Sequence, residues 1–541
     1  NYIFLLKAFM TNYLLECNMS DGAGKPPVVI VPDQTNITSG TEVQEKLILA
    51  ARVFSDLLKP TFGPRGLDKM LYKTDGTTAV TNDGAKIVAE LMVKHPAAKM
   101  MVSMGNVQEE TCGDGVTTTM LLCGSLLIEA NILLKKGLHP LKLVEGYRLA
   151  LDAAKEKIAE EATTVNKERL LGVAETALRG KGAETAIDLF SRIIVEALSV
   201  LSENRDSVSA ENVTMFKTGL NSIHDSRLLK GVIINRRVLM DNLPNNLLNP
   251  KIAVLNSDLK IRSFTRNVEI KITNTNQLDS FVEAEQERKE LIAKKIISTG
   301  ADVVFCTGEI DREILYLLSD NSILTVGELD SSEIENIAAA TGANIVDSIL
   351  DIETLDIGKC GSLHWERREH TDQIEDVITI GECKKPKIVT IEVGGSGDVH
   401  TEEIIRGLYD SLRATSNAIS ENEIILGAGT IHSQMANSVR LASESEPGKA
   451  RLAMEAFARA LETIPATLVE NSGGESLDRI LELRTASRES DIPMGINKDG
   501  FVTPTNNIWH PRSVIENSLE SATETAMSML RIDQVISSRG D

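Results

Sequence analysis

A change of pattern in the middle of the chain constrains the fold more than any other feature of the sequence. From about residue 45 to 160, and again from about 401 to 488, apolar residues recur at helical spacing with few breaks. From about residue 230 to 392, short strand-like runs such as 251–255 and 301–305 alternate with helical segments, which is typical of an α/β domain. The sequence therefore predicts a helical domain that is built from both ends of the chain and interrupted by an α/β insert.

The length and charge of the chain narrow the classes of protein to be considered. At 541 residues the chain is too long for one hydrophobic core, so two to four domains are expected. The 78 acidic and 57 basic residues give a formal net charge of −21. The sequence contains no basic stripe that could neutralise phosphates, so we expect no nucleic-acid partner.

Three short loops rich in glycine and aspartate separate the apolar runs of the first half. They are residues 63–66, 82–84 and 113–118. Glycines let the backbone approach a phosphate, and successive N–H groups there form an anion-binding nest. Asp83 and Asp114 offer oxygen ligands for Mg²⁺ or a carboxylate that orients water, and the hydroxyls of Thr117 and Thr118 can donate to phosphate oxygens. One such loop is usually an ordinary turn; three in this order predict a nucleotide site, which lacks the GxxxxGK[ST] run of a Walker P-loop.

The order of these loops resembles that in the group II chaperonins, the archaeal thermosome family, and the resemblance extends from about residue 26 to 533. The segments that carry it are 47–53, 61–71, 176–184, 303–306, 340–343 and 530–533. It implies a multidomain α+β/α fold with three domains. These are a helical equatorial ATPase domain (26–165 and 425–541), an intermediate hinge domain (166–235 and 388–424) and an α/β apical domain (236–387) with a helical protrusion.

The resemblance also implies the residues of an ATP site. Asp410 corresponds to the aspartate that positions the attacking water, Asp83 to the second acidic residue and Asp114 to the Mg²⁺ ligand, so these three are the expected catalytic residues. Lys181 corresponds to the sensor of the γ-phosphate. The expected nucleotide-binding residues are Phe62, Gly63, Pro64, Gly84, Gly113, Asp114, Gly115, Val116, Thr117, Thr118, Lys181, Gly427, Ala428 and Gly429. The cofactors would be ATP and Mg²⁺.

Four positions depart from the family pattern. Val116 replaces a threonine, so one hydroxyl donor is lost; Ala428 replaces a glycine, which matters if that position needs φ > 0; and His432 stands where the family has glutamate. The segment 498–510 is shorter than in the family, and its ribose-contacting aspartate has no clear equivalent among Thr505, Asn506 and Asn507. These departures predict weaker ATP binding or slower turnover.

The resemblance implies a subunit of a double-ring, ATP-driven chamber that encloses unfolded proteins. Its partners would be itself or paralogous subunits in stacked rings of eight or nine, together with non-native protein substrates. The alternative is a structural or regulatory subunit of a mixed ring with weak or no ATPase activity. The segment 28–31 reads as an edge strand, which in the family pairs with the neighbouring subunit.

The apical segments leave alternatives open. By its residues alone, 276–300 is a surface helix packed on a sheet, with apolar patches at 278–282 and 291–296. The resemblance instead implies that about 259–290 forms a built-in lid. Apolar residues near the expected substrate groove are equally ambiguous between core and binding: Leu315, Leu317, Leu318, Ile334 and Ile337.

The cysteines and the first residues bear on localisation. No CxxC pair occurs, so the cysteines are expected to be buried in a reducing cytoplasm. The apolar segment 2–6 is too short to span a membrane. We expect 1–25 to be an extension outside the fold, with Met10 or Met19 as the true start; a signal peptide is the alternative by pattern. The cysteines are Cys17, Cys112, Cys123, Cys306, Cys360 and Cys383.

Overall fold

The computed structural model divides into two compact units. It describes residues 36–39, 41–72, 76, 78–91, 93, 95–205, 207–218, 222–240, 242–261, 275–369, 374–395, 398–490 and 492–537. One unit contains the chain up to Lys46 and from Ile532 onward, and the other contains Leu47–Arg531. In the first unit, β1 (Asn36–Ser39) pairs antiparallel with β21 (Gln534–Ser537). The expected strand at 28–31 and the extension 1–25 lie outside the described residues.

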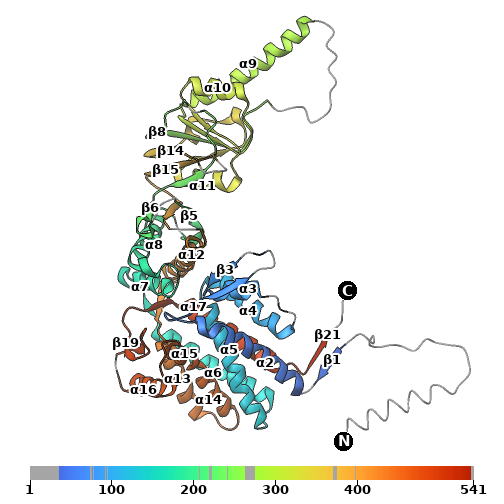
Figure 1. Ribbon diagram of the computed structural model, residues 1–541, viewed down its shortest axis with the longest axis vertical. Helices are drawn as coiled ribbons and strands as arrows, with labels where there is room; N and C mark the ends of the chain where they lie inside the picture. Colours follow the sequence, from blue (N-terminus) through green and yellow to red (C-terminus); the bar gives the residue numbers. More distant parts are fainter. Residues whose placement is uncertain are drawn as a thin grey trace, which may run out of the picture. The chain divides into compact units, whose positions relative to one another are not determined.

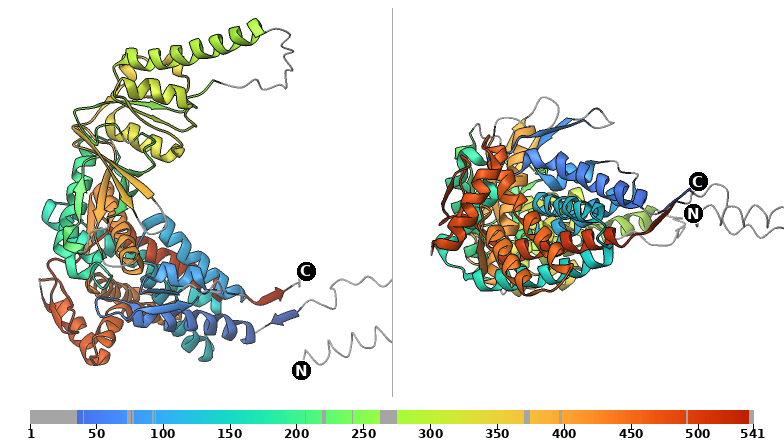
Figure 2. Two further views of the ribbon diagram at one scale, coloured as in Figure 1. Left: turned by 45° about the horizontal axis from the view of Figure 1, so that its top comes forward. Right: turned by 90° about the horizontal axis from the view of Figure 1, so that it is seen from below.

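Helices from both ends of the chain pack together in the larger unit (Figures 1 and 2). Apolar side chains at helical spacing give each helix one buried face, and these faces form a common core. This confirms the predicted helical region. Its helices are α2 (Thr41–Leu58), α3 (Gly84–Glu90), α4 (Pro96–Cys112), α5 (Val116–Lys135), α6 (Pro140–Glu161), α13 (Thr430–Ser445), α14 (Ala450–Leu461), α15 (Thr463–Asn471), α16 (Ser476–Glu489) and α17 (Arg512–Leu530).

Helix α5 lies at the centre of this bundle. Among the described residues it is the one helix long and apolar enough to cross a membrane. Most of its side chains are buried, and it packs against α4, α14 and α17. It is therefore a core helix, and it lies in the region where the sequence pattern predicted helix.

Short strands lie within and beside the helical region, and three of them, β2, β3 and β17, fall where the sequence pattern predicted helix. A hairpin of β2 (Lys69–Tyr72) and β3 (Thr78–Thr81) follows α2. A small sheet has the order β20-β17-β4 and joins segments far apart in the sequence, while β18 and β19 form a second hairpin. Their bounds are Thr163–Thr164 (β4), Glu423–Leu426 (β17), Met494–Ile496 (β18), Val502–Pro504 (β19) and Trp509–Pro511 (β20).

A middle region of three helices and a small sheet follows the first helical segment. It is built from two stretches of the chain, because the chain returns to it near residue 389. Helix α12 (Asp398–Glu421) packs against α7 (Lys167–Leu178) and α8 (Ile187–Ser202). The sheet has the order β5-β16-β6, with bounds Val213–Lys217, Val389–Val393 and Arg227–Leu229. Buried aliphatic residues of all these elements form one core, which holds α12 in place.

The central part of the sequence forms an α/β region with two sheets. One has the order β11-β10-β9-β12, all parallel, with β13 antiparallel to β9; the other has the antiparallel order β7-β15-β14-β8. The strands are β7 (Val232–Asn235), β8 (Asn246–Leu248), β9 (Lys251–Leu255), β10 (Val303–Cys306), β11 (Leu324–Val326), β12 (Ile345–Val346), β13 (Gly358–Lys359), β14 (Ser362–Glu369) and β15 (Ile374–Gly381). Helices α10 (Arg312–Asp320) and α11 (Ser331–Thr341) pack beside them. The predicted α/β insert is therefore present.

Helix α9 (Thr275–Thr299) is continuous over 25 residues. In its second half, the side chains of Ile292, Ala293 and Ile296 are buried, whereas the side chains at 282–288 are exposed. Figure 1 shows the helix extending beyond the sheets. The region expected to form a lid includes 262–274, which lies outside the described residues.

The ambiguous apical residues are core residues in this structure. Ile334, Ile337, Leu315 and Leu318 are buried, and Leu317 is half-buried. The side chains of Ile334 and Ile337 belong to one core cluster, and those of Leu317 and Leu318 belong to another; both clusters include residues of the parallel sheet. The structure therefore favours the core alternative for these positions over the binding alternative.

Candidate functional site

The glycine loops converge on one cavity of about 230 Å³. All residues expected to bind nucleotide line it, although they come from five separate stretches of the sequence. Asp83 and Asp410 line it too. The helical region supplies most of the wall, and the middle region supplies Lys181 and Asp410. The structure thus brings the sequence-predicted residues together.

The floor of the cavity is formed by backbone at two helix starts. Gly113 ends α4 with φ 67°, Gly115 has φ 88°, and α5 begins at Val116 without a side-chain cap. A Cβ atom on Gly84 would lie 2.3 Å from Oγ1 of Thr117, so only glycine lets α3 approach α5 this closely. The N–H groups and the helix dipole at the uncapped start of α5 favour a bound anion such as phosphate.

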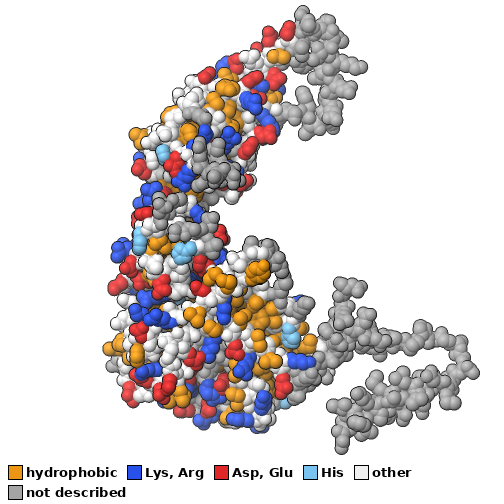
Figure 3. Space-filling view, viewed as in Figure 1, with side chains coloured by type: hydrophobic (Ala, Val, Ile, Leu, Met, Phe, Trp, Pro, Cys, Tyr) orange, Lys and Arg blue, Asp and Glu red, His pale blue; other side chains and the backbone are white. Residues whose placement is uncertain are grey.

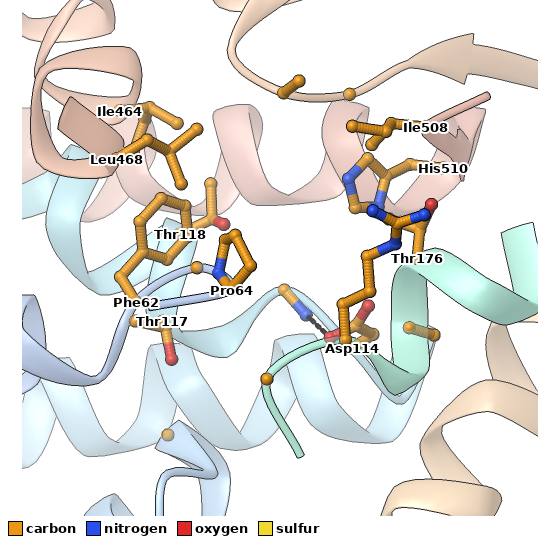
Figure 4. Close-up of a pocket in the computed structure, with 18 of the residues that line it drawn as sticks. Phe62, Pro64, Asp114, Thr117, Thr118, Thr176, Ile464, Leu468, Ile508 and His510 are labelled. Atoms are coloured by element: carbon orange, nitrogen blue, oxygen red, sulfur yellow. Dashed lines mark hydrogen bonds between the residues drawn. The ribbon is translucent and has the colours of Figure 1, made fainter. Parts of the chain in front are cut away.

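Carboxylates surround this floor. Asp83 caps α3, because its side chain accepts hydrogen bonds from the N–H groups of Ala85 and Lys86 at 3.0 and 3.3 Å. Asp114 accepts a hydrogen bond at 2.8 Å from the N–H of Gly115 (Figure 4). These contacts hold both carboxylates at the edge of the anion-binding floor.

The carboxylates fit Mg²⁺ that is shared with nucleotide phosphates. In the part of the chain that the structure describes, no three His, Cys, Asp or Glu side chains form a metal cluster on their own. Mg²⁺ in nucleotide sites is commonly bound by one or two carboxylates together with phosphate oxygens. Asp114 and Asp83, beside a cradle that glycines keep open, match this type of site.

Lys181 and Asp410 form a buried ion pair at the cavity wall. The distance from Nζ to Oδ2 is 2.6 Å. Burial raises the pKa of Asp410, Lys181 opposes this effect, and Asp83 and Asp114 add to it. Burial alone would lower the pKa of Lys181, but the carboxylates of Asp410, Asp114 and Asp83 raise it above its usual range. Lys181 is therefore a cation held among acids, where it can also meet a phosphate.

The other end of the cavity is apolar. Figure 4 shows Phe62, Pro64, Ile464 and Leu468 on one side and Ile508 on the other. The loop before Gly63 is fixed by Nδ2 of Asn471, which donates to the carbonyls of Lys59 and Phe62 at 2.9 and 2.8 Å. This slot suits a flat, weakly polar group such as a nucleobase.

The positions that depart from the family pattern have distinct environments. Val116 is buried and faces α4, where a Cβ atom on Gly105 would lie 3.4 Å from its Cγ1 atom. Ala428 has φ 55°, so this position does need a positive φ, and an alanine there carries strain. His432 is buried, and burial together with His510 lowers its pKa to about 3. Neither histidine is therefore a cation at neutral pH, since burial lowers the pKa of His510 as well.

The shortened segment 498–510 provides no carboxylate to the cavity. Thr505 is buried and bonded to Thr430 at 3.1 Å, while Asn506 and Asn507 are exposed. The side-chain oxygen of Asn497 accepts from the N–H groups of Asp499 and Phe501, both at 3.0 Å, and so stabilises the β18–β19 turn. The wall at this end consists of Asn497, Lys498, Ile508 and His510.

Sequence reasoning missed several residues at the cavity. Glu109, His510 and Arg65 line it. Gln108 is fully buried, and its Nε2 donates to the carbonyl of Asp114 at 2.9 Å from beneath the loop. For these residues the sequence offered one signal: Glu109 lies a single helical turn before the 113–118 loop, which places it close to the predicted site.

The comparisons agree with this geometry. Residues 54–539 match the TCP-1/cpn60 chaperonin family. Thermosome subunit beta and thermosome subunit alpha of Archaeoglobus fulgidus are each 36% identical to the chain over 523 residues, which cover 95% of both chains. The thermosome subunit of Methanocaldococcus jannaschii is 36% identical over 518 residues, covering 94% of this chain and 95% of its own.

Proposed function

The chain belongs to the TCP-1/cpn60 chaperonin family, and from this premise we propose that it is a subunit of an ATP-driven, double-ring chamber that encloses non-native proteins and assists their folding. The observation that carries the proposal is the convergence of the glycine loops, three aspartates and Lys181 on one cavity. Two of these groups, Lys181 and Asp410, come from the middle region, so occupancy of the cavity would be coupled to that region.

In the proposed reaction, the N–H groups at the start of α5 and the hydroxyls of Thr117 and Thr118 bind the phosphates of ATP. Lys181 places a positive charge beside the terminal phosphate. Asp410 accepts a hydrogen bond from the attacking water and orients it in line with the bond to be broken. Asp114 would hold Mg²⁺, with Asp83 as the second acid, and Mg²⁺ held there would supply positive charge against the phosphates.

The domain roles follow the limits expected from the sequence. We assign 26–165 and 425–541 to the equatorial part, 166–235 and 388–424 to the hinge, and 236–387 to the apical part. The exposed side chains at 282–288 support the assignment of about 259–290 to a lid. ATP binding would move α12 with Asp410, and the apical part would follow.

Assembly with further subunits is supported by exposed apolar side chains. Figure 3 shows hydrophobic side chains gathered over the helical region. Leu49 and Val53 on α2, Val107 on α4, and Met70 and Tyr72 on β2 are all exposed. Apolar surface of this kind is typical of a subunit that packs against others. We propose rings of eight or nine copies of this chain or of paralogues, in the cytoplasm.

Steady-state ATP hydrolysis by the purified protein tests the proposal, with ring size measured in the same samples. The matched variant is Asp410→Ala. We expect turnover in the wild type and its loss in the variant, which should still form rings. If the wild type forms rings but hydrolyses ATP no faster than the variant, the structural-subunit alternative is correct and Ala428 and Val116 become the first residues to revert.

A further inference from the structure

Helix α12 presents three polar side chains to the loop that joins α4 and α5. Asp410, Arg413 and Asn417 are three and four residues apart, so they lie on one face of the helix. We propose that Arg413, paired with Glu109, is a positioning residue that holds Asp410 over the phosphate-binding loop. This inference rests on the proposed function, because it concerns the placement of the residue that orients water.

The aliphatic stem of Arg413 lies across Gly113. A Cβ atom on Gly113 would come within 2.3 Å of Cδ, 2.7 Å of Cβ and 3.1 Å of Cγ of Arg413. Gly113 therefore serves two purposes, since its left-handed φ of 67° also ends α4 one residue before Asp114. The stem rests on the backbone that sets the direction of the Asp114 carboxylate.

The head of Arg413 reaches the helix on the other side of this loop. Its Nη1 donates to Oε1 of Glu109 at 2.8 Å. Burial raises the pKa of Glu109, Asp83 and Asp114 add to this effect, and Arg413 opposes it more strongly than Lys181 does. Without Arg413, Glu109 would be an additional partly buried negative charge beside the carboxylates of the site.

A third contact fixes α12 to the same turn. Nδ2 of Asn417 donates to the carbonyl of Cys112 at 3.1 Å. Glu109, Cys112 and Gly113 all belong to the end of α4, so Arg413 and Asn417 both contact the same turn. Any movement of α12 away from this turn must break the Arg413 contact and displace Asp410, which lies one helical turn earlier.

Three variants separate the parts of this contact. Arg413→Ala removes the stem and the charge, Arg413→Met keeps a stem without the charge, and Arg413→Lys keeps a charge at the end of a similar stem. Because a displacement of about 1 Å can cost about 100-fold in rate, we expect Arg413→Ala to lower kcat by about 10- to 100-fold. The Kd for nucleotide should change far less, and Arg413→Lys should recover most of kcat.

Glu109→Gln tests the pair. If the two residues act together, Arg413→Met combined with Glu109→Gln should be no slower than Arg413→Met alone. Arg459→Met is the matched control, since Arg459 and Glu129 also pair at 2.8 Å with similar exposure but lie outside the cavity. It should leave kcat unchanged. Should Arg413→Ala fail to fold, Arg413→Met and Glu109→Gln still decide the matter, because wild-type kcat in both of these variants overturns the inference.

Hydrogen exchange at residues 109–115 gives a readout that does not depend on activity. We expect faster exchange in Arg413→Ala without nucleotide, and unchanged exchange in Arg459→Met. Asp410→Ala, measured alongside, separates the two proposals. Retained turnover in Asp410→Ala contradicts the proposed function, whereas loss of turnover there with wild-type kcat and exchange in Arg413→Ala contradicts the positioning role alone.

Discussion

At the scale of single residues, the cavity depends on backbone conformations that few side chains tolerate. Gly113, Gly115 and Gly429 have φ between 67° and 88°, and Ala428 has φ 55° beside them. The carbonyl of Ala428 accepts from the N–H of Ile496 at 2.9 Å, so its backbone cannot relax without loss of that bond. The strain is thus fixed in the wall of the site.

Ala428→Gly should relieve this strain. Left-handed backbone costs a non-glycine residue about 1–2 kcal/mol, and the greater freedom of glycine in the unfolded chain offsets about 0.5–1 kcal/mol of the gain. We therefore expect a small net increase in the free energy of unfolding and tighter nucleotide binding, measured by denaturant titration and calorimetry. Ala162→Gly is the control, because Ala162 has φ −63° and should lose stability instead.

The protonation of Asp410 should set the acid limit of turnover. Its pKa is raised by burial and by Asp83 and Asp114, although Lys181 opposes them. Only the carboxylate can orient water as a hydrogen-bond acceptor, so turnover should rise with pH through this raised pKa. The acid limb should lie well above the usual pKa of aspartate, about 3.9. A pH profile of kcat that stays flat down to about this value, in protein that remains folded by circular dichroism, would contradict the prediction.

At the scale of elements, one charged side chain on each of α12 and α9 links the helix to a neighbouring segment. Helix α12 belongs to the core of the middle region and delivers Asp410 to the cavity. The second half of helix α9 contains the buried residues Ile292, Ala293 and Ile296, and it includes Lys289. The Nζ atom of Lys289 lies 3.0–3.2 Å from carboxylates of Glu285, Asp311 and Glu313. This cluster fixes the helix to α10 and the loop before it.

Lys289→Met should loosen α9. The substitution leaves three carboxylates without their shared cation, and loss of a hydrogen bond to a charged group costs about 1.5–3 kcal/mol when the group is buried. We expect faster hydrogen exchange or protease cleavage within 283–296, with the sheets unaffected. Lys294→Met is the control, because Lys294 is exposed and pairs only with Glu290 among the described residues. Equal protection in both variants would mean that apolar packing alone holds the helix.

Element types followed from the sequence wherever the local pattern was strong. Strands β9 and β10 lie close to their expected limits, and α12 begins near the expected start at about 401, because apolar periodicity is a local property. The hairpin β2–β3 and strand β17 were missed. Each of these three strands is four residues long, and β17 forms its hydrogen bonds with β4 and β20, which are distant in the sequence.

At the scale of the whole molecule, the exposed apolar residues of the β2–β3 hairpin bear on assembly. Met70 and Tyr72 are 73% and 77% exposed and lie on the same face of β2. Tyr72→Glu should therefore reduce ring formation, measured by sedimentation, while leaving the thermal stability of the chain almost unchanged. Leu355→Glu, at an isolated position that is 84% exposed, should leave assembly intact. Rings of wild-type size in Tyr72→Glu would exclude this hairpin from the interface.

The sequence by itself determined the helical regions near both ends of the chain, the α/β insert and the three glycine loops of the cavity, because glycine turns and apolar spacing act within a few residues of the chain. Tertiary structure alone decided the contacts between distant segments. Glu109 meets Arg413, His432 lies beside His510, and Gln108 supports the Asp114 turn. No local preference encodes such pairs, since each forms only after separate elements have packed. The contacts between α12 and the end of α4 are therefore a property of the folded chain.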